Sequence, residues 1–266
     1  MKKTELIGLF LKNPLSILKK GLLSQYEAQF KKDLQSKYKI SQLPTIDLLD
    51  LFDDFEEELT AYSFLDGTSL ITDIILLKKL AKKYPNCNYL EIGSWRGESL
   101  KNISEVAQHC TSLTLSPAEM KSLGWSQGFV DVHAVFSKGL KNVTELLHNS
   151  RTFDFSKIGP FDLIFIDGDH TYEGVLNDTK KTFDLRKSSS SVIVWHDYGY
   201  STEIVRASVL KAILDGVPAE KHKNLYHVSN TLCAIYIEDG NFNTYQTKFP
   251  TYPNKTFSVK LKTSRI

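Results

Sequence analysis

The stretch FDLIFIDGDHTYEGVLNDTKKTFDLRK, residues 161–187, decides the fold. Its opening run carries five apolar residues and then becomes polar at once, with Asp167, Gly168, Asp169 and His170 in succession. The following segment, residues 172–187, is of helical length. A short apolar run bounded by glycine and followed by such a segment is typical of a buried strand that leads into a helix. This unit predicts a parallel sheet with helices between its strands.

The same alternation extends over most of the chain. Helical segments are predicted at residues 68–84, 97–110 and 172–187, and strands at residues 88–93, 111–116, 129–135, 161–167, 190–197, 225–229 and 232–238. The last two strands are separated only by Asn230 and Thr231, so they should pair as an antiparallel hairpin. Strands joined by helices form right-handed crossovers and a parallel sheet. The expected fold is therefore α/β, a Rossmann-like, doubly wound sheet of seven mainly parallel strands.

Composition limits the class of protein. The chain has 266 residues, of which 41% are hydrophobic and 24% charged, which are ordinary values for a globular protein. We expect one α/β domain at residues 66–240, between an N-terminal helical extension (1–65) and a C-terminal tail (241–266). A net charge of +2 gives no reason to expect a nucleic-acid partner. The three cysteines, Cys87, Cys110 and Cys233, form no C-x-x-C pair, which favours a reducing, cytoplasmic compartment over a disulfide framework.

The N-terminal stretch LIGLFLKNPLSILKKGLL, residues 6–23, is amphipathic and basic. Lysines interrupt its apolar run, so neither a signal peptide nor a membrane-spanning helix is expected. Residues 1–40 hold nine lysines and three acids, a local net charge of +6. Two interpretations remain open: a helix packed on the domain or on a second copy in a homodimer, and a peripheral contact with an anionic membrane surface. Residues 46–59 are predicted to form a second, solvated amphipathic helix.

The residues that follow the predicted strands are the candidates for a binding site, because ligands bind at the carboxyl ends of parallel strands. After the first strand comes EIGSWRGES (91–99), whose G-x-x-x-G spacing differs from the G-x-G-x-x-G of a pyrophosphate cradle. Asp167 and Asp197 end two consecutive predicted strands, Asp167 three residues before His170 and Asp197 directly after His196. Converging carboxylates suit a hard cation such as Mg²⁺ or an acid/base pair. The alternative is that Asp169, His170 and Asp197 cap helices.

The segments YLEIGSWRGES, FDLIFIDGDHTYEGVLNDTKKTFDL and SSVIVWHDYG together resemble the class I S-adenosylmethionine-dependent methyltransferases. Within that class the sequence is most similar to the macrocin-type sugar O-methyltransferases, with catechol-type enzymes more distant. The resemblance extends over about residues 66–238. It implies a methyltransferase domain that uses S-adenosylmethionine as cofactor.

The resemblance also assigns expected roles to single residues. Glu91, Gly93, Ser94 and Gly97 match the motif whose loop wraps the amino-acid end of the cofactor. Ser116 stands where the family usually has an acid that holds the ribose, and Ser137, after the predicted third strand, stands near the adenine. Asp167 and Asp197 match the acids that hold a divalent ion in metal-dependent members, and Asp167 is also expected beside the cofactor. Tyr198 replaces a further oxygen ligand of those members, so Asp169 or His196 would have to complete the shell.

The expected reaction is O-methylation of a sugar or another small hydroxylated acceptor, assisted by Mg²⁺ if a metal is used. The catalytic candidates are His170, Asp169 and His196. His170 is the first candidate for the general base, since an unperturbed imidazole is largely neutral near pH 7. A competing role for His170 is to orient Asp167. Two other functions stay open: a nicotinamide-linked oxidoreductase, and a non-catalytic scaffold that docks through its basic N-terminal segment.

Overall fold

The computed structural model describes residues 14–265, with side chains from residue 23 onward. Most of the basic stretch at residues 6–23 therefore lies outside the described residues, or within the part of α2 whose side chains are not described. No helix in the described part of the chain is long and apolar enough to span a membrane. The helices are α2 (Pro14–Lys37), α3 (Leu48–Leu51), α4 (Ile71–Ala81), α5 (Glu98–Ser104), α6 (Pro117–Ser122), α7 (Gln127–Asp131), α8 (Tyr172–Thr182) and α9 (Ala207–Gly216). Short 3₁₀ turns occupy Phe155–Lys157, Phe183–Leu185 and Ala219–Asn224.

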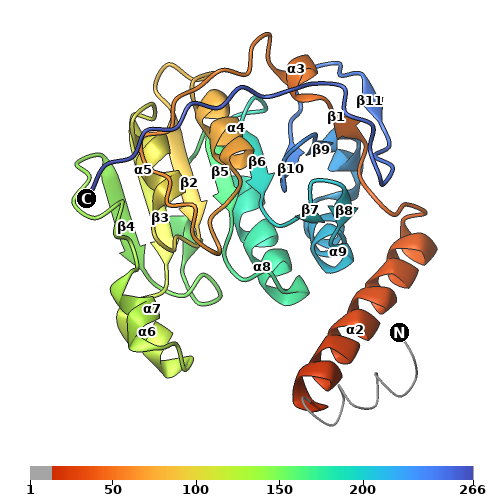
Figure 1. The fold of residues 1–266 in the computed structure, drawn as a ribbon, viewed down its shortest axis with the longest axis horizontal. Coiled ribbons are helices and arrows are strands. Elements are labelled where there is room, and N and C mark those ends of the chain that lie inside the picture. The colour runs from red at the N-terminus through yellow and green to blue at the C-terminus, as the bar shows by residue number, and fades with distance from the viewer. Residues whose placement is uncertain (1–13, 266) are drawn as a thin grey trace.

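A nine-stranded sheet forms the centre of the molecule (Figure 1), in the order β11-β1-β9-β10-β6-β5-β2-β3-β4. Its strands are β1 (Thr45–Ile46), β2 (Asn88–Ile92), β3 (His109–Thr114), β4 (Val143–Leu147), β5 (Leu163–Ile166), β6 (Val192–Trp195), β9 (Leu225–Val228), β10 (Ala234–Tyr236) and β11 (Thr244–Tyr245). A separate hairpin pairs β7 (Gly199–Ser201) with β8 (Ile204–Val205). Strands β2 to β6 run parallel, whereas β10 is antiparallel to both of its neighbours. The predicted mainly parallel α/β sheet with a C-terminal hairpin is confirmed.

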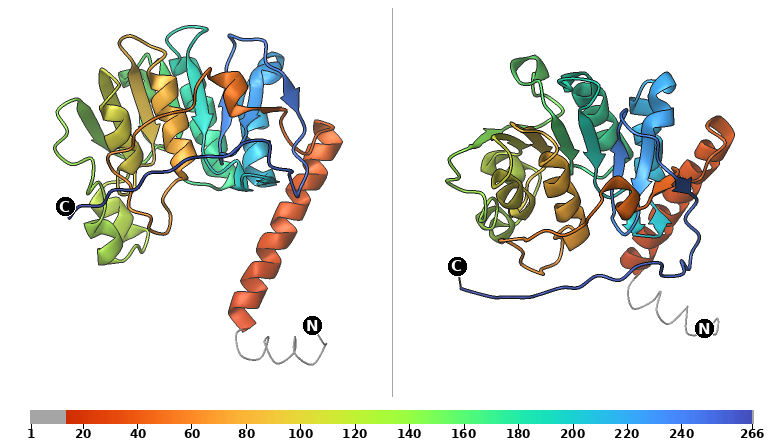
Figure 2. Two further views of the ribbon diagram at one scale, coloured as in Figure 1. Left: turned by 45° about the horizontal axis from the view of Figure 1, so that its top comes forward. Right: turned by 90° about the horizontal axis from the view of Figure 1, so that it is seen from above.

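Helices cover both faces of the sheet because successive side chains of a buried strand point to opposite faces. In β5, Leu163 and Phe165 join a core that includes residues of α3, α4 and α5. Ile164 and Ile166 join the other core, which includes residues of α8 and α9 together with Leu34 of α2. The continuous apolar run that predicts this strand is thus buried on both sides. Figure 2 shows the resulting layers, with α2 extending beyond the body of the sheet.

The strand register aligns the candidate site residues. Ile92 of β2 pairs with Leu113 of β3 on one side and with Ile166 of β5 on the other. Ile166 in turn pairs with Trp195 of β6. The residues that follow these positions therefore meet at one edge of the sheet.

The third strand lies elsewhere than predicted. Residues 129–135 are the end of α7 and a turn, because Ser126 caps α7 by accepting a hydrogen bond from the Phe129 amide. The third strand of the βα series is β4, at the sheet edge, where most of its side chains are exposed or half-buried. An edge strand carries little of the apolar signal by which buried strands are recognised.

The predicted helix at residues 46–59 is also wrong in extent. Only α3 is helical there, and the acidic residues beyond it lie in an extended segment along α4. Asp54 and Glu57 form ion pairs with Lys79 and Lys82 of α4. The extended path places these acids next to lysines of α4. On a helix of their own, they would stand next to other acids without basic partners.

The segments on either side of the expected domain also contribute strands. β1 lies before residue 66 and pairs with β9, and β11 lies after residue 240 and pairs with β1. The described parts of the extension and the tail thus share one sheet with the central domain. The boundaries at residues 65 and 240 stay a prediction.

Candidate active site

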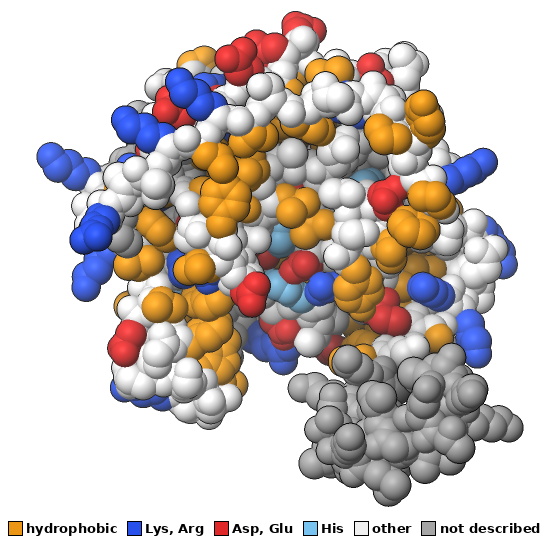
Figure 3. All heavy atoms as spheres, viewed as in Figure 1, with side chains coloured by type: hydrophobic (Ala, Val, Ile, Leu, Met, Phe, Trp, Pro, Cys, Tyr) orange, Lys and Arg blue, Asp and Glu red, His pale blue; other side chains and the backbone are white. Residues whose placement is uncertain are grey.

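A cavity of about 480 Å³ opens where β2, β3, β5 and β6 end. Figure 3 shows histidine and acidic side chains together in a hollow near the centre of this face. Seven of the predicted site residues line the cavity: Gly93, Ser94, Asp167, Asp169, His170, His196 and Asp197. The other four, Glu91, Gly97, Ser116 and Ser137, lie outside its lining.

Gly93 brings the ends of β2 and β5 together. Its φ of +86° lies in the left-handed region, and a Cβ at this position would stand 2.3 Å from the carbonyl oxygen of Asp167. No side chain fits that gap, so only glycine allows this approach. The Gly93 amide also donates a hydrogen bond of 2.9 Å to the Leu113 carbonyl of β3. One residue thus joins three strand ends at the floor of the cavity.

Glu91 lies beneath this loop and is fully buried. Its carboxylate accepts hydrogen bonds from the hydroxyls of Tyr89 (2.7 Å) and Ser99 (3.0 Å). Burial raises the pKa of Glu91 to about 7. The carboxylate holds β2 to the start of α5 and does not reach the cavity surface.

The two serines expected beside the ribose and the adenine have structural contacts. Ser116 caps α6 by accepting a hydrogen bond from the Glu119 amide, while the Glu119 carboxylate accepts from the Ser116 amide and hydroxyl. Ser137 is buried in the turns before β4, where a Cβ at Gly97 would come within 2.5 Å of its hydroxyl oxygen. The strand that was expected to precede Ser137 is absent from residues 129–135, so its predicted place after a strand is wrong.

Two carboxylates and two imidazoles form a compact cluster in the cavity. Oδ2 of Asp197 lies 2.5 Å from Nδ1 of His170 and 3.6 Å from Nδ1 of His196. Oδ1 of Asp167 lies 3.0 Å from Nδ1 of His196 and 3.4 Å from Nε2 of His170. One ligand atom each from Asp167, His196 and Asp197 can be chosen so that all three lie within 4.8 Å of one another. Nη2 of Arg206 lies 3.3 Å from the other oxygen of Asp197.

The pKa values of this cluster shift in opposite directions. Burial alone would raise the pKa of both carboxyls, but the neighbouring imidazoles lower the pKa of Asp167 and of Asp197 below their ordinary values. Burial alone would lower the pKa of His170, but Asp167 and Asp197 raise it to about 10. The pKa of His196 is likewise raised well above its ordinary value. Both imidazoles therefore carry a proton at neutral pH when nothing else balances the carboxylates, contrary to the expected neutral His170.

The donor set also fits a divalent cation. Nδ1 of His196 is buried and has no hydrogen-bond partner among the described residues, although it faces two carboxylates. An imidazole nitrogen aimed at two carboxylate oxygens needs either a proton or a cation between them. Carboxylates with an imidazole suit ions such as Mn²⁺, whereas Mg²⁺ prefers oxygen ligands alone. Tyr198 contributes nothing here, since its buried hydroxyl accepts a hydrogen bond of 2.8 Å from the Leu43 amide.

Asp169 points away from the cluster. Its carboxylate accepts hydrogen bonds from the amide (3.0 Å) and hydroxyl (2.9 Å) of Thr171, the N-cap of α8, and pairs with Arg151 at 2.7 Å. The alternative assignment of Asp169 to the start of the helix thus describes its contacts, although the side chain also lines the cavity.

Of the aromatic residues that line the cavity, Trp95 belongs to the segment EIGSWRGES, whereas Trp125 and Phe129 belong to no motif. Trp95 stacks on Phe129 with ring centroids 4.4 Å apart, and Trp125 meets Phe129 edge-on at 4.7 Å. These three rings line the cavity and form an aromatic wall. Asp73 of α4 reaches His196 from behind. Isolated residues on a helix or in a turn belong to no motif, so only the fold reveals them.

Comparison with known proteins finds one family model and several solved structures that resemble the chain. Residues 90–198 match the family model of a methyltransferase domain. No curated protein matches the sequence. Among solved structures, the chain is similar to an O-methyltransferase from Bacillus cereus in complex with SAH, with 14% identity, 65% of this chain and 84% of that chain covered, and a TM-score of 0.45. It is also similar to the O-methyltransferase TomG from Streptomyces achromogenes (14% identity, 66% and 83% covered, TM-score 0.44) and to the methyltransferase PaMTH1 from Podospora anserina (18% identity, 68% and 84% covered, TM-score 0.43).

The matched residues 90–198 contain the glycine loop, both carboxylates and both imidazoles of the cavity. The family model thus matches the central part of the predicted methyltransferase domain.

Proposed function

We propose that the protein transfers a methyl group from S-adenosylmethionine to a hydroxyl of a sugar or another small hydroxylated acceptor, with the help of a divalent cation. One observation carries the proposal: the close approach at Gly93 and the Asp167, His196 and Asp197 cluster share a single cavity. The first feature suits a cofactor that lies against backbone, and the second suits an acceptor that must lose a proton.

In this proposal the cofactor lies along the glycine loop. Gly93 and Ser94 would contact its amino-acid end, while Gly97 and Glu91 hold the loop in shape. Leu115 and Met120 supply apolar surface beyond the end of β3, as an adenine ring requires. Ser116 and Ser137 would act on this part through the turns that they stabilise. The sulfonium would then face Asp167, which lies between the loop and the cluster.

The cluster would prepare the acceptor. When bound, the cation would position vicinal hydroxyls and lower the pKa of the one that is methylated. Asp167, Asp197 and His196 are the residues that would hold it. His170, with its pKa of about 10, cannot accept a proton at neutral pH while it is the group that balances the carboxylates. A general-base role for His170 therefore requires that balance to come from elsewhere, whereas a role in orienting Asp167 does not.

Positioning supplies the rest of the chemistry. Methyl transfer from a sulfonium is an in-line displacement, in which the acceptor oxygen bonds to the methyl carbon as the carbon–sulfur bond breaks. Alignment of these atoms can lower the barrier by several kcal/mol, on the order of 7 for an ideal geometry. The aromatic wall of Trp95, Phe129 and Trp125 would exclude water from one side of the reacting atoms.

The test is calorimetric titration of the full chain with S-adenosylmethionine and, separately, with NAD, each with Mn²⁺, with Mg²⁺ and with a chelator. We expect micromolar binding of S-adenosylmethionine and none of NAD. Asp167→Ala should lose the cation heat, while the exposed control Asp184→Ala should keep it. Binding of NAD alone would support an oxidoreductase, and binding of neither ligand would support a scaffold.

A further inference from the structure

We propose that Asp73 is a positioning residue that orients His196, so that the Nδ1 atom of this imidazole serves as the third ligand of the divalent cation. The inference rests on the proposed function for the presence of that cation. Asp73 belongs to none of the sequence motifs and lies in α4, more than a hundred residues before His196.

Asp73 has hydrogen-bond donors next to both oxygens of its carboxylate. Its side chain is fully buried, and its carboxylate accepts four donors. Oδ2 accepts from the Leu70 amide (2.8 Å) and from Nε2 of His196 (3.0 Å). Oδ1 accepts from the Leu232 amide (2.8 Å) and from the Cys233 thiol (3.6 Å). His196 is the only basic side chain that contacts Asp73 among the described residues.

This contact decides which nitrogen of His196 is free. A carboxylate only accepts hydrogen bonds, so Nε2 must carry the hydrogen that it donates to Asp73. Nδ1 is then the atom directed at Asp167 and Asp197, 3.0 Å and 3.6 Å from the nearest oxygen of each. A carboxylate behind a ligating imidazole sets both the tautomer and the ring orientation at many metal sites.

The backbone contacts make Asp73 a rigid support. The Leu70 amide belongs to the N-cap of α4, and the Leu232 amide to the segment that leads into β10. The ring of His196 is therefore fixed relative to α4 and β10 as well as to its own strand end. A side chain held in this way cannot follow a displaced ligand, so the site should be selective for cations that accept nitrogen.

The matched control follows from the same contacts. Leu70 has φ −60° and ψ 151°, which proline can adopt. Leu70→Pro therefore removes the amide that Asp73 accepts at the helix cap, but it leaves the contact with His196 in place. Asp73→Asn removes the charge, and its single carbonyl oxygen cannot serve both sides of the original carboxylate. Leu70→Pro thus tests the contact of Asp73 with the start of α4, and Asp73→Asn tests its contact with His196.

The experiment measures Mn²⁺ affinity by electron paramagnetic resonance, with thermal unfolding of the same full-length samples. We expect Asp73→Asn to bind Mn²⁺ about 10-fold to 100-fold more weakly than the wild type. Leu70→Pro should stay within about twofold of the wild type, even if it lowers the unfolding temperature. A second readout is the proton resonance of His196 Nε2–H, assigned by its loss in His196→Gln, which should persist in Leu70→Pro and shift or vanish in Asp73→Asn.

Three results would overturn the inference: no Mn²⁺ binding by the wild type, unchanged affinity in a folded Asp73→Asn, or equal losses in Asp73→Asn and Leu70→Pro. Its failure is distinguishable from that of the proposed function, because the parallel titration with S-adenosylmethionine reports cofactor binding without reference to Mn²⁺. If the wild type does not bind S-adenosylmethionine but the three proteins show the expected differences in Mn²⁺ affinity, the proposed methyl transfer is contradicted and the role of Asp73 is not.

Discussion

Gly93 is the residue at which the fold and the site depend most directly on each other. Its left-handed backbone and its missing side chain together let the end of β2 touch the Asp167 backbone. Any side chain there would push apart the two strand ends that carry the glycine loop and the first carboxylate. A residue that the sequence offers only as part of a weak G-x-x-x-G spacing is therefore a steric requirement of the cavity.

We predict that Gly93→Ala destabilises the protein by more than about 2 kcal/mol, because the left-handed backbone costs about 1 kcal/mol and the clash adds to it. Because the glycine loop would be displaced, the variant should also lose the proposed binding of S-adenosylmethionine. Gly139→Ala is the control, since Gly139 has a φ of +78° but no atom within 4 Å of an added Cβ. Urea unfolding of both variants checks the prediction, and equal losses would contradict the steric argument.

The ionic cluster should also make stability depend on pH. The folded-state pKa of His170 is about 10, above the ~6.5 of an unfolded histidine. Its contribution to stability is therefore complete below about pH 6.5 and is lost as the pH rises through about 10. In cation-free protein, the free energy of unfolding should fall across this interval.

Asp197→Asn tests whether the raised pKa of His170 causes this dependence of stability on pH. Asp197 has a φ of +53°, which asparagine tolerates, so the backbone should be preserved. Removal of the carboxylate 2.5 Å from Nδ1 should lower the pKa of His170 and flatten the decline of stability above pH 6.5. Nuclear magnetic resonance titration of His170, assigned with His170→Gln, measures the pKa directly. An unchanged pKa would mean that the ion pair does not form in solution.

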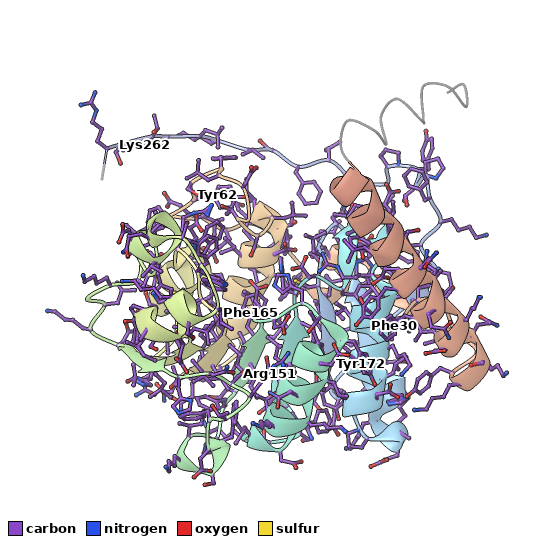
Figure 4. All side chains as sticks on the ribbon, turned by 90° about the horizontal axis from the view of Figure 1, so that it is seen from below. Phe30, Tyr62, Arg151, Phe165, Tyr172 and Lys262 are labelled. Carbon is purple, nitrogen blue, oxygen red and sulfur yellow. The ribbon has the colours of Figure 1, made fainter. Side chains whose placement is uncertain are left out.

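At the scale of elements, α2 is joined to α8 and α9 by a mixed aromatic and ionic contact. Figure 4 shows Phe30 of α2 beside Tyr172 of α8, with ring centroids 5.1 Å apart. The carboxylate of Asp215, at the end of α9, accepts hydrogen bonds from the side chains of Lys37, Tyr38, Tyr172 and Lys211. Because Tyr172 follows His170 by two residues, this contact anchors the N-terminal helix next to the candidate site.

We predict that Asp215→Ala lowers the free energy of unfolding by about 2 kcal/mol, since a largely buried carboxylate with several charged partners is lost. Burial alone would raise the pKa of Asp215, but Lys211 and Lys37 lower it. Its contribution is thus present above about pH 4 and is lost as the pH falls below that value. Asp184→Ala, which removes an exposed carboxylate, should cost less than about 0.5 kcal/mol. Denaturant unfolding at pH 7 and pH 3 checks both variants.

At the scale of the whole molecule, the two ends of the chain close one side of the sheet. The tail beyond β11 runs in extended form from this side towards the β4 edge (Figure 1). Its contacts concentrate near its start, where Lys255 is only 9% exposed and pairs with Asp47 at 2.6 Å. Asp47 caps α3 next to β1, so the tail secures the outer strands.

Deletion of residues 246–266 should therefore lower the free energy of unfolding by about 1–3 kcal/mol, because Asp47 loses Lys255, and Gln42 and Thr45 lose their hydrogen bonds to Thr247. Deletion of residues 258–266 alone should change it by less than about 0.5 kcal/mol, since residues 258–265 are exposed. Thermal and urea unfolding compare the two truncations. Equal losses would mean that the stabilising contacts lie nearer the end of the chain.

Buried parallel strands such as β5 and β6 could be predicted because both faces demand apolar side chains, which leaves an unbroken signal. β4 could not, because an edge strand is mostly exposed. The short strands β1 and β11 could not either, since two residues carry no periodicity. In the site, Asp167, Asp197, His170 and His196 were predicted because they follow predicted strands directly. Asp73, Arg206, Trp125 and Phe129 come from helices and turns, where no spacing distinguishes a site residue from a packed or solvated one.

By itself, the sequence determined the alternation of strands and helices, and with it the edge at which the polar residues gather, because hydrophobic periodicity and chain connectivity are local properties. Only the tertiary structure decided which nitrogen of His196 faces the carboxylates and how His170 is charged. It also decided which segments close the sheet. Those properties depend on distances of a few ångströms between residues far apart in the chain, and burial and Coulomb interactions vary steeply over such distances.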